Sequence, residues 1–345
     1  IGEFHSMLNS LLQRLMARQD VGHAEMAAAM GHIMDGDVSP AATAAFLVAL
    51  HMKGETPSEL AGAAEAMRAR MHPLRTHRSA LVDTCGTGGS GSGAFNISTA
   101  TAFVLAADGL AVAKHGNRAV SSKSGSADVL AALGVNIDAE APIVEACLDE
   151  LGIGFLYAPR WHPAMRHVAP VRRELGVRTI FNVLGPLTNP AGAKRQVLGV
   201  YARHWLVPLA NVLKALGSER ACVVHGEDGL DELTVCGTTH VAEWTGSEVH
   251  EYELTPEALG LPRAPPGSLR GGDAPSNAER MRALLTGAEL HTPMADAVCL
   301  NAAAALYVSG RVQSLREGLS RARKHLAAGR PAAVLEALAA RSHAG

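Results

Sequence analysis

A strand, a glycine-rich loop and a helix are predicted in succession for residues 81–99, which read LVDTCGTGGSGSGAFNIST. Five glycines fall within the eight positions 86–93, between the apolar start and the apolar helix that opens near residue 97. Glycine lets the backbone approach a ligand closely, and the free N–H groups at a helix N-terminus attract anions. We therefore expect a phosphate-binding loop, with a flexible linker as the alternative. The stretch has neither the Gly-Lys-Ser/Thr of a P-loop nor the acidic residue that follows a dinucleotide-binding loop.

A second polar loop follows the next short apolar run, residues 111–113. Residues 114–128 read KHGNRAVSSKSGSAD and hold two lysines, an arginine, a histidine and four serines. Loops that follow neighbouring parallel strands meet at one edge of the sheet, so we expect both loops to line one polyphosphate pocket. A solvated basic loop is the alternative for this stretch taken alone.

The order of apolar patterns predicts an α/β fold with two domains. The first fifth of the chain reads as four helices, with a serine N-cap and a proline at Ser39-Pro40 and a capping box from Thr56 to Glu59. Further on, short apolar runs alternate with helical stretches, which is typical of a largely parallel sheet; these runs are 111–113, 154–157, 197–201 and 221–224. We expect a small N-terminal α-helical domain, residues 7–75, hinge-linked to a large α/β domain with a mostly parallel central sheet, residues 76–345.

Later segments add detail to this prediction. Residues 165–175 are expected to form one helix, and the segment near 165–190 is expected to return to the helical domain as a hinge. Residues 251–275 are rich in proline and glycine, and predict irregular structure preceded by one strand. The remaining helices are expected at about 277–285, 293–308 and 312–327, with a weaker one after Pro331.

Composition and charge exclude several classes of protein. The 345 residues are 48% hydrophobic and 19% charged, which predicts a globular chain with a sizeable core. The net charge of −2 argues against a nucleic-acid partner, so any polyanion must meet a local basic site. The five cysteines lie far apart, without a Cys-x-x-Cys pair, and favour reduced thiols in a cytoplasmic protein. No apolar run approaches the ~20 residues of a membrane span, and residues 1–6 read as a remnant of cloning.

Two further groups carry chemistry by residue type. Asp231 and Glu232 stand side by side after the apolar run 221–224, and adjacent carboxylates near a polyphosphate pocket favour a metal site over an acidic surface turn. Residues 165–175 place basic side chains on one face of the expected helix, and a guanidinium pairs bidentately with a carboxylate. His225 is expected to orient the acidic loop rather than to bind metal. No Ser/His/Asp or Cys/His arrangement for nucleophilic catalysis stands out.

Three motifs resemble the anthranilate phosphoribosyltransferases of tryptophan biosynthesis. They are NIST at 96–99, KHGNRAVSSKSGSADVL at 114–130 and RTIFNVLGPLTNP at 178–190. The resemblance implies transfer of the 5-phosphoribosyl group from phosphoribosyl pyrophosphate to the amine of anthranilate. The products would be N-(5-phosphoribosyl)anthranilate and pyrophosphate, in the second step from chorismate. It also implies that the donor and Mg2+ bind on the α/β domain, that the acceptor lies between the domains, and that a homodimer forms through the helical domains.

The resemblance also assigns site residues by matched position. For the donor these are Gly86, Gly89, Ser90, Ala94, Asn96, Ile97, Ser98, Thr99, Lys114, His115, Gly116, Asn117, Arg118, Ala119, Val120, Ser121, Ser122 and Ser126. For the acceptor it implies Gly86, Asn117 and Arg172, with His115 and Pro186 lining the aromatic pocket. Mg2+ would be held by Ser98, Asp231 and Glu232, and no residue would act as a covalent nucleophile.

The glycine loop departs from the family pattern, and two alternative functions stay open. Ser90 stands where the family usually has an aspartate, and Ala94 lacks the polar side chain often found there, which predicts altered metal or donor dependence. A pyrimidine-nucleoside phosphorylase shares the fold, but is expected to have a Lys-x-Ser-Gly-Arg loop where this chain has residues 114–118. A non-catalytic nucleic-acid-binding paralogue would need a lysine-rich surface and the loss of Asp231 and Glu232.

Overall fold

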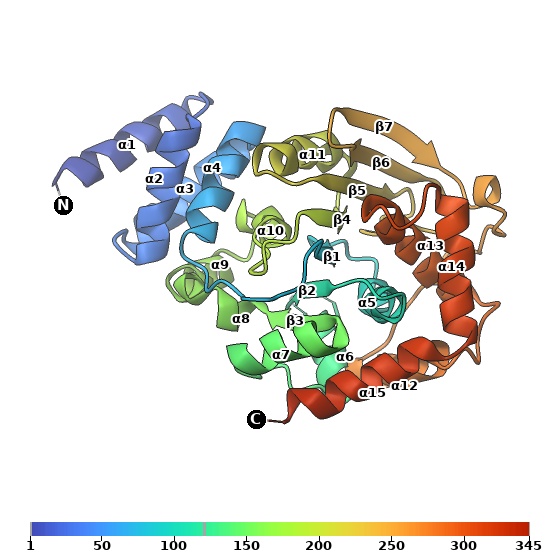
Figure 1. The fold of residues 1–345 in the computed structure, drawn as a ribbon. Coiled ribbons are helices and arrows are strands. Elements are labelled where there is room, and N and C mark those ends of the chain that lie inside the picture. Colours follow the sequence, from blue (N-terminus) through green and yellow to red (C-terminus); the bar gives the residue numbers. More distant parts are fainter. Residues whose placement is uncertain (1, 120–121, 345) are drawn as a thin grey trace.

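The N-terminal part of the computed structural model is a bundle of four helices (Figure 1). The structure describes residues 2–119 and 122–344. The bundle consists of α1 (Gly2–Met16), α2 (His23–Asp35), α3 (Pro40–Lys53) and α4 (Pro57–Arg68). Both predicted caps are confirmed: the Ser39 hydroxyl accepts the Ala42 amide, and Thr56 and Glu59 form the capping box. The first helix begins at Gly2, within the stretch that was left out of the fold prediction.

The α/β part is built on one sheet of seven strands in the order β3-β2-β1-β4-β5-β6-β7. The first five are parallel, as predicted: β1 (Val82–Gly86), β2 (Val112–Gly116), β3 (Ile153–Tyr157), β4 (Arg195–Gly199) and β5 (Arg220–Gly226). Antiparallel strands β6 (Thr239–Trp244) and β7 (Val249–Leu254) extend one side. The sequence predicts one strand and then an irregular stretch at 251–275. The start of that irregular stretch is wrong, because residues 251–254 belong to β7, an edge strand with alternating exposure.

Helices cover both faces of the sheet. Side chains of successive residues point to opposite faces, so Cys222 and Val224 join one apolar cluster, whereas Ala221 and Val223 join another. The first cluster packs against α5 (Ile97–Ala107), α6 (Ser126–Ala132), α12 (Ala274–Leu285), α13 (Pro293–Val308), α14 (Leu315–Ala327) and α15 (Arg330–Ser342). The second includes α11 (Leu206–Ala215) and continues into the four-helix bundle. Helix α7 (Ala141–Leu151) packs beside β3 with a third, smaller cluster.

The segment between β3 and β4 is broken into short helices. They are α8 (Ala158–Trp161), η1 (Pro163–His167), α9 (Ala169–Leu175), α10 (Phe181–Leu184) and η2 (Gly185–Leu187), where η marks a 3-10 helix; η3 (Arg203–Trp205) and η4 (Glu257–Leu259) lie later in the chain. The single helix expected at 165–175 is wrong, because Pro170 has no N–H to donate and starts a new helix instead. The segment packs against α2, α3 and α4. The domain boundary at residues 75 and 76 and the hinge stay predictions.

The strand order creates a crevice at the carboxyl edge of the sheet. From β1 the chain proceeds outward to β2 and β3, and then returns to the other side of β1 with β4. Gly86 and Gly199, the last residues of β1 and β4, are paired in register. Ligands of open α/β sheets bind outside the carboxyl ends of strands at such a reversal of strand order.

Within the described ranges, no helix combines the length and apolar character that a membrane crossing needs.

Candidate active site

The carboxyl ends of β1 and β4 lie against the acidic residues that follow β5. A Cβ atom on Gly199 would lie 1.5 Å from the Asp231 carbonyl oxygen, and one on Gly86 would lie 2.6 Å from Asp231 Oδ2. Position 199 therefore requires glycine, whereas a side chain at position 86 would displace the Asp231 carboxylate. Their missing side chains let residues 231 and 232 pack onto the edge of the sheet at the reversal of strand order.

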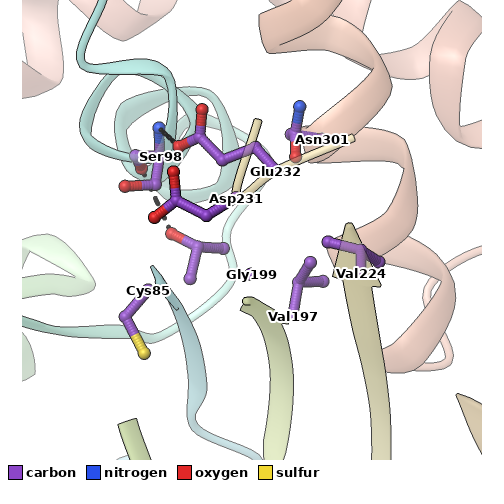
Figure 2. A pocket seen from close by; sticks show the side chains of 9 residues that line it. Cys85, Ser98, Val197, Gly199, Val224, Asp231, Glu232 and Asn301 are labelled. Carbon is purple, nitrogen blue, oxygen red and sulfur yellow. Dashed lines mark hydrogen bonds between the residues drawn. The ribbon is translucent and has the colours of Figure 1, made fainter. Parts of the chain in front are cut away.

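The two carboxylates contact the glycine loop and the helix after it, and Figure 2 shows the bond from Ser98 to Glu232 with Asp231 beside it. Oδ2 of Asp231 accepts the Gly88 amide at 3.2 Å, and Oε1 of Glu232 accepts the Ser98 amide at 2.9 Å. Ser98 lies in the first turn of α5, where amides have no partner within the helix. Burial, and then the charge of Asp231, raise the pKa of Glu232 well above its usual range. The Glu232 carboxylate is thus costly to keep ionised without a cation nearby.

The Asp231 and Glu232 carboxylates can serve as metal ligands only if further oxygen atoms complete the coordination of the metal. Thr84, Cys85, Ser98, Asp231, Glu232 and Asn301 are among the residues that line the pocket. Among the described residues, neither carboxylate forms an ion pair, and no group of three or more His, Cys, Asp or Glu side chains is arranged to hold a metal. Mg2+ commonly binds one or two carboxylates, with its other positions filled by water and substrate phosphates. The oxygen donors of Ser98, Asp231 and Glu232 fit that preference.

The two polar loops meet, as predicted, through Asn96. Its side-chain amide donates to the Ser124 carbonyl at 3.0 Å, and its Oδ1 accepts the Ser124 hydroxyl at 3.2 Å and the Asn277 amide at 2.9 Å. Asn96 belongs to the glycine loop and Ser124 to the second loop, so one asparagine links the predicted halves of the pocket. Residues 93–95 also pair with residues 269–271.

Asp128 organises the second loop from the first turn of α6. Its carboxylate accepts the amides of Ala119 and Gly125 and the Arg118 guanidinium, at 2.8, 2.9 and 3.0 Å. The Ser126 hydroxyl bonds the backbone of Asn117. This leaves Asn117 and Arg118 exposed at the edge of the sheet. Two of the predicted donor-binding residues, Val120 and Ser121, lie outside the described residues.

A buried polar network supports the loops from below. Asp83 is fully buried in β1 and accepts the Asn189 amide at 2.8 Å and the His115 backbone N–H at 3.3 Å. Burial raises the pKa of Asp83, whereas Lys114 opposes that rise. Lys114 is also buried, and donates to the His115 carbonyl. The network joins β1, β2 and the stretch before β4 beneath the candidate site.

The residues expected around the acceptor are only partly brought together. The His115 ring lies 3.1 Å from His162, Nε2 to Nε2, and beside the backbone of Gly185, which precedes the buried Pro186. Burial holds the pKa of His115 well below its usual range and lowers that of His162 to about 4. Arg172 lies on α9 with its guanidinium 5.5 Å from the centre of the Phe181 ring. Among the described residues, no hydrogen bond or ion pair joins the Arg172 side chain to Gly86 or Asn117.

Comparison with known proteins places the chain in a family. The descriptions "Glycosyl transferase family, helical bundle domain" and "Glycosyl transferase family, a/b domain" match residues 9–71 and 78–332. An anthranilate phosphoribosyltransferase of Anaeromyxobacter sp. (strain Fw109-5) is 56% identical over 313 residues, 91% of this chain and 92% of that protein. The chain belongs to the anthranilate phosphoribosyltransferase family.

Solved structures of anthranilate phosphoribosyltransferases have the same fold. The enzyme of Thermus thermophilus matches with a TM-score of 0.91 at 50% identity, over 96% of this chain and 99% of that one. The enzyme of Saccharomyces cerevisiae, solved in complex with PRPP and Mg, matches with a TM-score of 0.89 at 26% identity, over 98% of both chains. The helical domain and the mostly parallel sheet predicted from the sequence are thereby confirmed.

Several residues at this candidate site escaped the sequence prediction. Asn301 accepts the Leu233 amide and donates to its carbonyl, which fixes the turn after Glu232. The signal was available, because Asn301 and Asp83 are polar residues inside otherwise apolar stretches, where burial demands a partner. Arg178 and Tyr201 flank the glycine loop, and neither is among the predicted site residues, although Arg178 opens the motif at 178–190. His225 hydrogen bonds the Val200 carbonyl at 2.8 Å, which agrees with an orienting role.

Proposed function

We propose that this chain transfers the 5-phosphoribosyl group from phosphoribosyl pyrophosphate to the amine of anthranilate, as its membership of the family implies. The observation that carries the proposal is the contact of Asp231 and Glu232 with the glycine loop and with the start of α5. It places oxygen donors for a cation beside N–H donors for an anion, at the reversal of strand order. A metal pyrophosphate needs both kinds of donor in one place.

The two loops would hold the donor. The glycine loop offers backbone N–H groups, and the first turn of α5 adds the positive end of a helix. Arg118 supplies positive charge from the second loop, and the buried Lys114 supplies it from the end of β2. The proposed donor residues are Gly86, Gly89, Ser90, Ala94, Asn96, Ile97, Ser98, Thr99, Lys114, His115, Gly116, Asn117, Arg118, Ala119, Ser122 and Ser126. The S. cerevisiae relative, solved in complex with PRPP and Mg, supports phosphoribosyl pyrophosphate as the ligand.

Ser98, Asp231 and Glu232 are the residues proposed to hold Mg2+. A bound cation would neutralise charge on the departing pyrophosphate. It would also offset the effects of burial and of the Asp231 charge, which raise the pKa of Glu232. The remaining ligands would be water and phosphate oxygens, because the described residues that line the pocket include two carboxylates, Asp231 and Glu232.

Arg172 is the residue proposed to bind the anthranilate carboxylate. Burial lowers the pKa of its guanidinium, and among the described residues no carboxylate is paired with it. A partly desolvated cation gains from an anionic ligand. Gly86 and Asn117 would contact the acceptor, with His115 and Pro186 beside its ring. The S. cerevisiae relative, solved with 4-fluoroanthranilate at 25% identity, supports an aromatic acid as ligand.

The chemistry would proceed by positioning and charge stabilisation. The loops would orient the donor so that its C1 atom faces the acceptor amine, and no side chain need form a covalent bond. The aniline amine is neutral at pH 7, so it needs no base before attack. Approach of the helical domain would exclude water that otherwise hydrolyses the donor. We further propose a homodimer formed through the helical domains, and a cytoplasmic location that agrees with the five free thiols.

Anthranilate fluorescence tests the proposed function directly. The signal is expected to fall when phosphoribosyl pyrophosphate and Mg2+ are both present, and to stay constant when either is left out. Constant fluorescence in the complete mixture would refute the assignment. Release of a free pyrimidine from a nucleoside in phosphate buffer would favour the phosphorylase alternative instead.

A further inference from the structure

The middle of the glycine loop has few contacts of its own. Gly88, Gly89, Gly91 and Gly93 have φ values of 66°, 69°, 69° and 61°, in the left-handed region that glycine adopts at low cost. Among the described residues, the Ser90 hydroxyl bonds only Ser92, two residues away in the same loop. A loop of this composition loses much conformational entropy when it is ordered. Its shape therefore depends on contacts from outside.

The two ends of the loop are held by the sheet and its surroundings. At one end the Thr87 amide donates to the Gly199 carbonyl at 2.8 Å, and the Thr87 hydroxyl accepts the Tyr201 amide at 3.1 Å. At the other end Gly93 accepts the Gly271 amide at 2.9 Å. Between these ends, Arg178 is the one side chain from outside the loop that hydrogen bonds residues 89–92, within the described part of the chain.

Arg178 is held in place on both its side chain and its backbone. Its guanidinium lies over the Tyr201 ring, with Cζ 4.1 Å from the ring centre. The next two residues, Thr179 and Ile180, are buried, and the Thr179 amide donates to the Asn182 side chain at 2.8 Å. Held in this way, Nη2 of Arg178 donates to the Gly89 carbonyl. A planar guanidinium can stack on a ring and donate in its own plane at the same time, which an ammonium cannot do.

We propose that Arg178 is a positioning residue that holds the glycine loop at Gly89 in the shape that receives the phosphoribosyl donor. The inference rests on the proposed function and adds a residue to the donor side of that site. Arg178 lies on the same segment as Arg172, whose guanidinium packs on Phe181. The segment proposed to bind the acceptor therefore also supports the loop proposed to bind the donor.

Substitutions on both sides of the stacked pair test this role. Arg178→Ala and Tyr201→Leu are each expected to raise the KM and the dissociation constant for phosphoribosyl pyrophosphate about tenfold, the scale of one charge-assisted hydrogen bond. The KM for anthranilate and kcat are expected to change less than about threefold, because the acceptor site and the reacting groups stay in place. Tyr201→Phe keeps the ring and is expected to behave as the wild type, whereas Arg178→Lys is expected to restore only part of the affinity.

Arg173→Ala is the matched control, because Arg173 is an exposed arginine on the same segment. Donor affinity is measured by calorimetry without anthranilate, so that it does not depend on turnover. A wild type that binds the donor but leaves anthranilate unchanged would refute the proposed function alone. An Arg178→Ala protein with the donor affinity of Arg173→Ala would overturn the positioning role alone. Normal affinity in Tyr201→Leu beside weak affinity in Arg178→Ala would also overturn it, because the guanidinium would then act on the donor directly.

Discussion

The Ser98 amide lies 2.9 Å from Oε1 of Glu232, across 134 positions of sequence. This hydrogen bond joins the first turn of α5 to the acidic turn that follows β5. The Ser98 amide is suited to an anion and the Glu232 carboxylate to a cation, and the hydrogen bond places these two groups in direct contact. A change at either end of this contact is therefore expected to disturb the other.

Replacing Glu232 with glutamine is expected to change how stability depends on pH. The pKa of Glu232 in the folded protein is raised above the usual 4.5. The protonated carboxyl therefore favours folding below pH 4.5, and this contribution is lost as the pH rises through the higher folded value. Without Mg2+, Glu232→Gln should unfold at a higher temperature than the wild type at neutral pH, and at the same temperature in acid.

The catalytic activity of Glu232→Gln should fall, although its unfolding temperature at neutral pH should rise. We expect kcat/KM to fall on the order of 100-fold, as when one stabilising group is lost from an active site. Added Mg2+ should stabilise the wild type more than the variant in thermal unfolding. Glu248→Gln, at an exposed glutamate in the turn before β7, is the control and should leave both measurements unchanged. A variant with the pH profile of the wild type would contradict the electrostatic account of this site.

Ser90→Asp is expected to alter the dependence of activity on Mg2+ and donor. Ser90 brings no charge to the loop and bonds only Ser92, so an aspartate would add a negative charge near the proposed donor site. The measurement is a titration of initial rate against Mg2+ and phosphoribosyl pyrophosphate for both proteins. Identical curves would refute the prediction.

Arg172→Ala is expected to weaken the acceptor site. The KM for anthranilate should rise roughly 10- to 100-fold, because a hydrogen bond to a charged group contributes about 1.5–3 kcal/mol. The KM for the donor should change little. Arg173→Ala on the same short helix is the control for a general effect of removing charge. Equal changes in both KM values would argue that Arg172 supports the fold rather than the acceptor.

Gly199→Ala is expected to displace the acidic turn. The added Cβ would lie 1.5 Å from the Asp231 carbonyl oxygen, so residues 231 and 232 must move. Overpacking of this kind costs about 1–3 kcal/mol, measured as the free energy of unfolding in denaturant, and activity should fall with it. Gly237→Ala is the comparison, because its nearest contact would be an ordinary 3.4 Å. Unchanged Mg2+ dependence in Gly199→Ala would contradict the tight packing of this turn.

Much of the fold could be predicted because the signals are local. The caps at Ser39 and Thr56 depend on residues within one turn of each helix, and both form as expected. Pro170 is also a local signal, because proline favours the first turn of a helix, but the pattern at 165–175 predicts one continuous helix. Strand β7 was missed because an edge strand exposes alternate residues and lacks the apolar run of a buried strand.

Short stretches of sequence carry the chemical content of the candidate site. Glycine density, clustered donors and the pair Asp231-Glu232 are properties of such stretches, so they could be recognised without a fold. Which of these stretches meet depends on the tertiary structure. Arg178 and Gly89 are 89 positions apart, and Gly88 and Asp231 are 143 apart. Their contacts exist because β4 lies beside β1 in the sheet, and that strand order depends on the packing of the whole chain rather than on any local pattern.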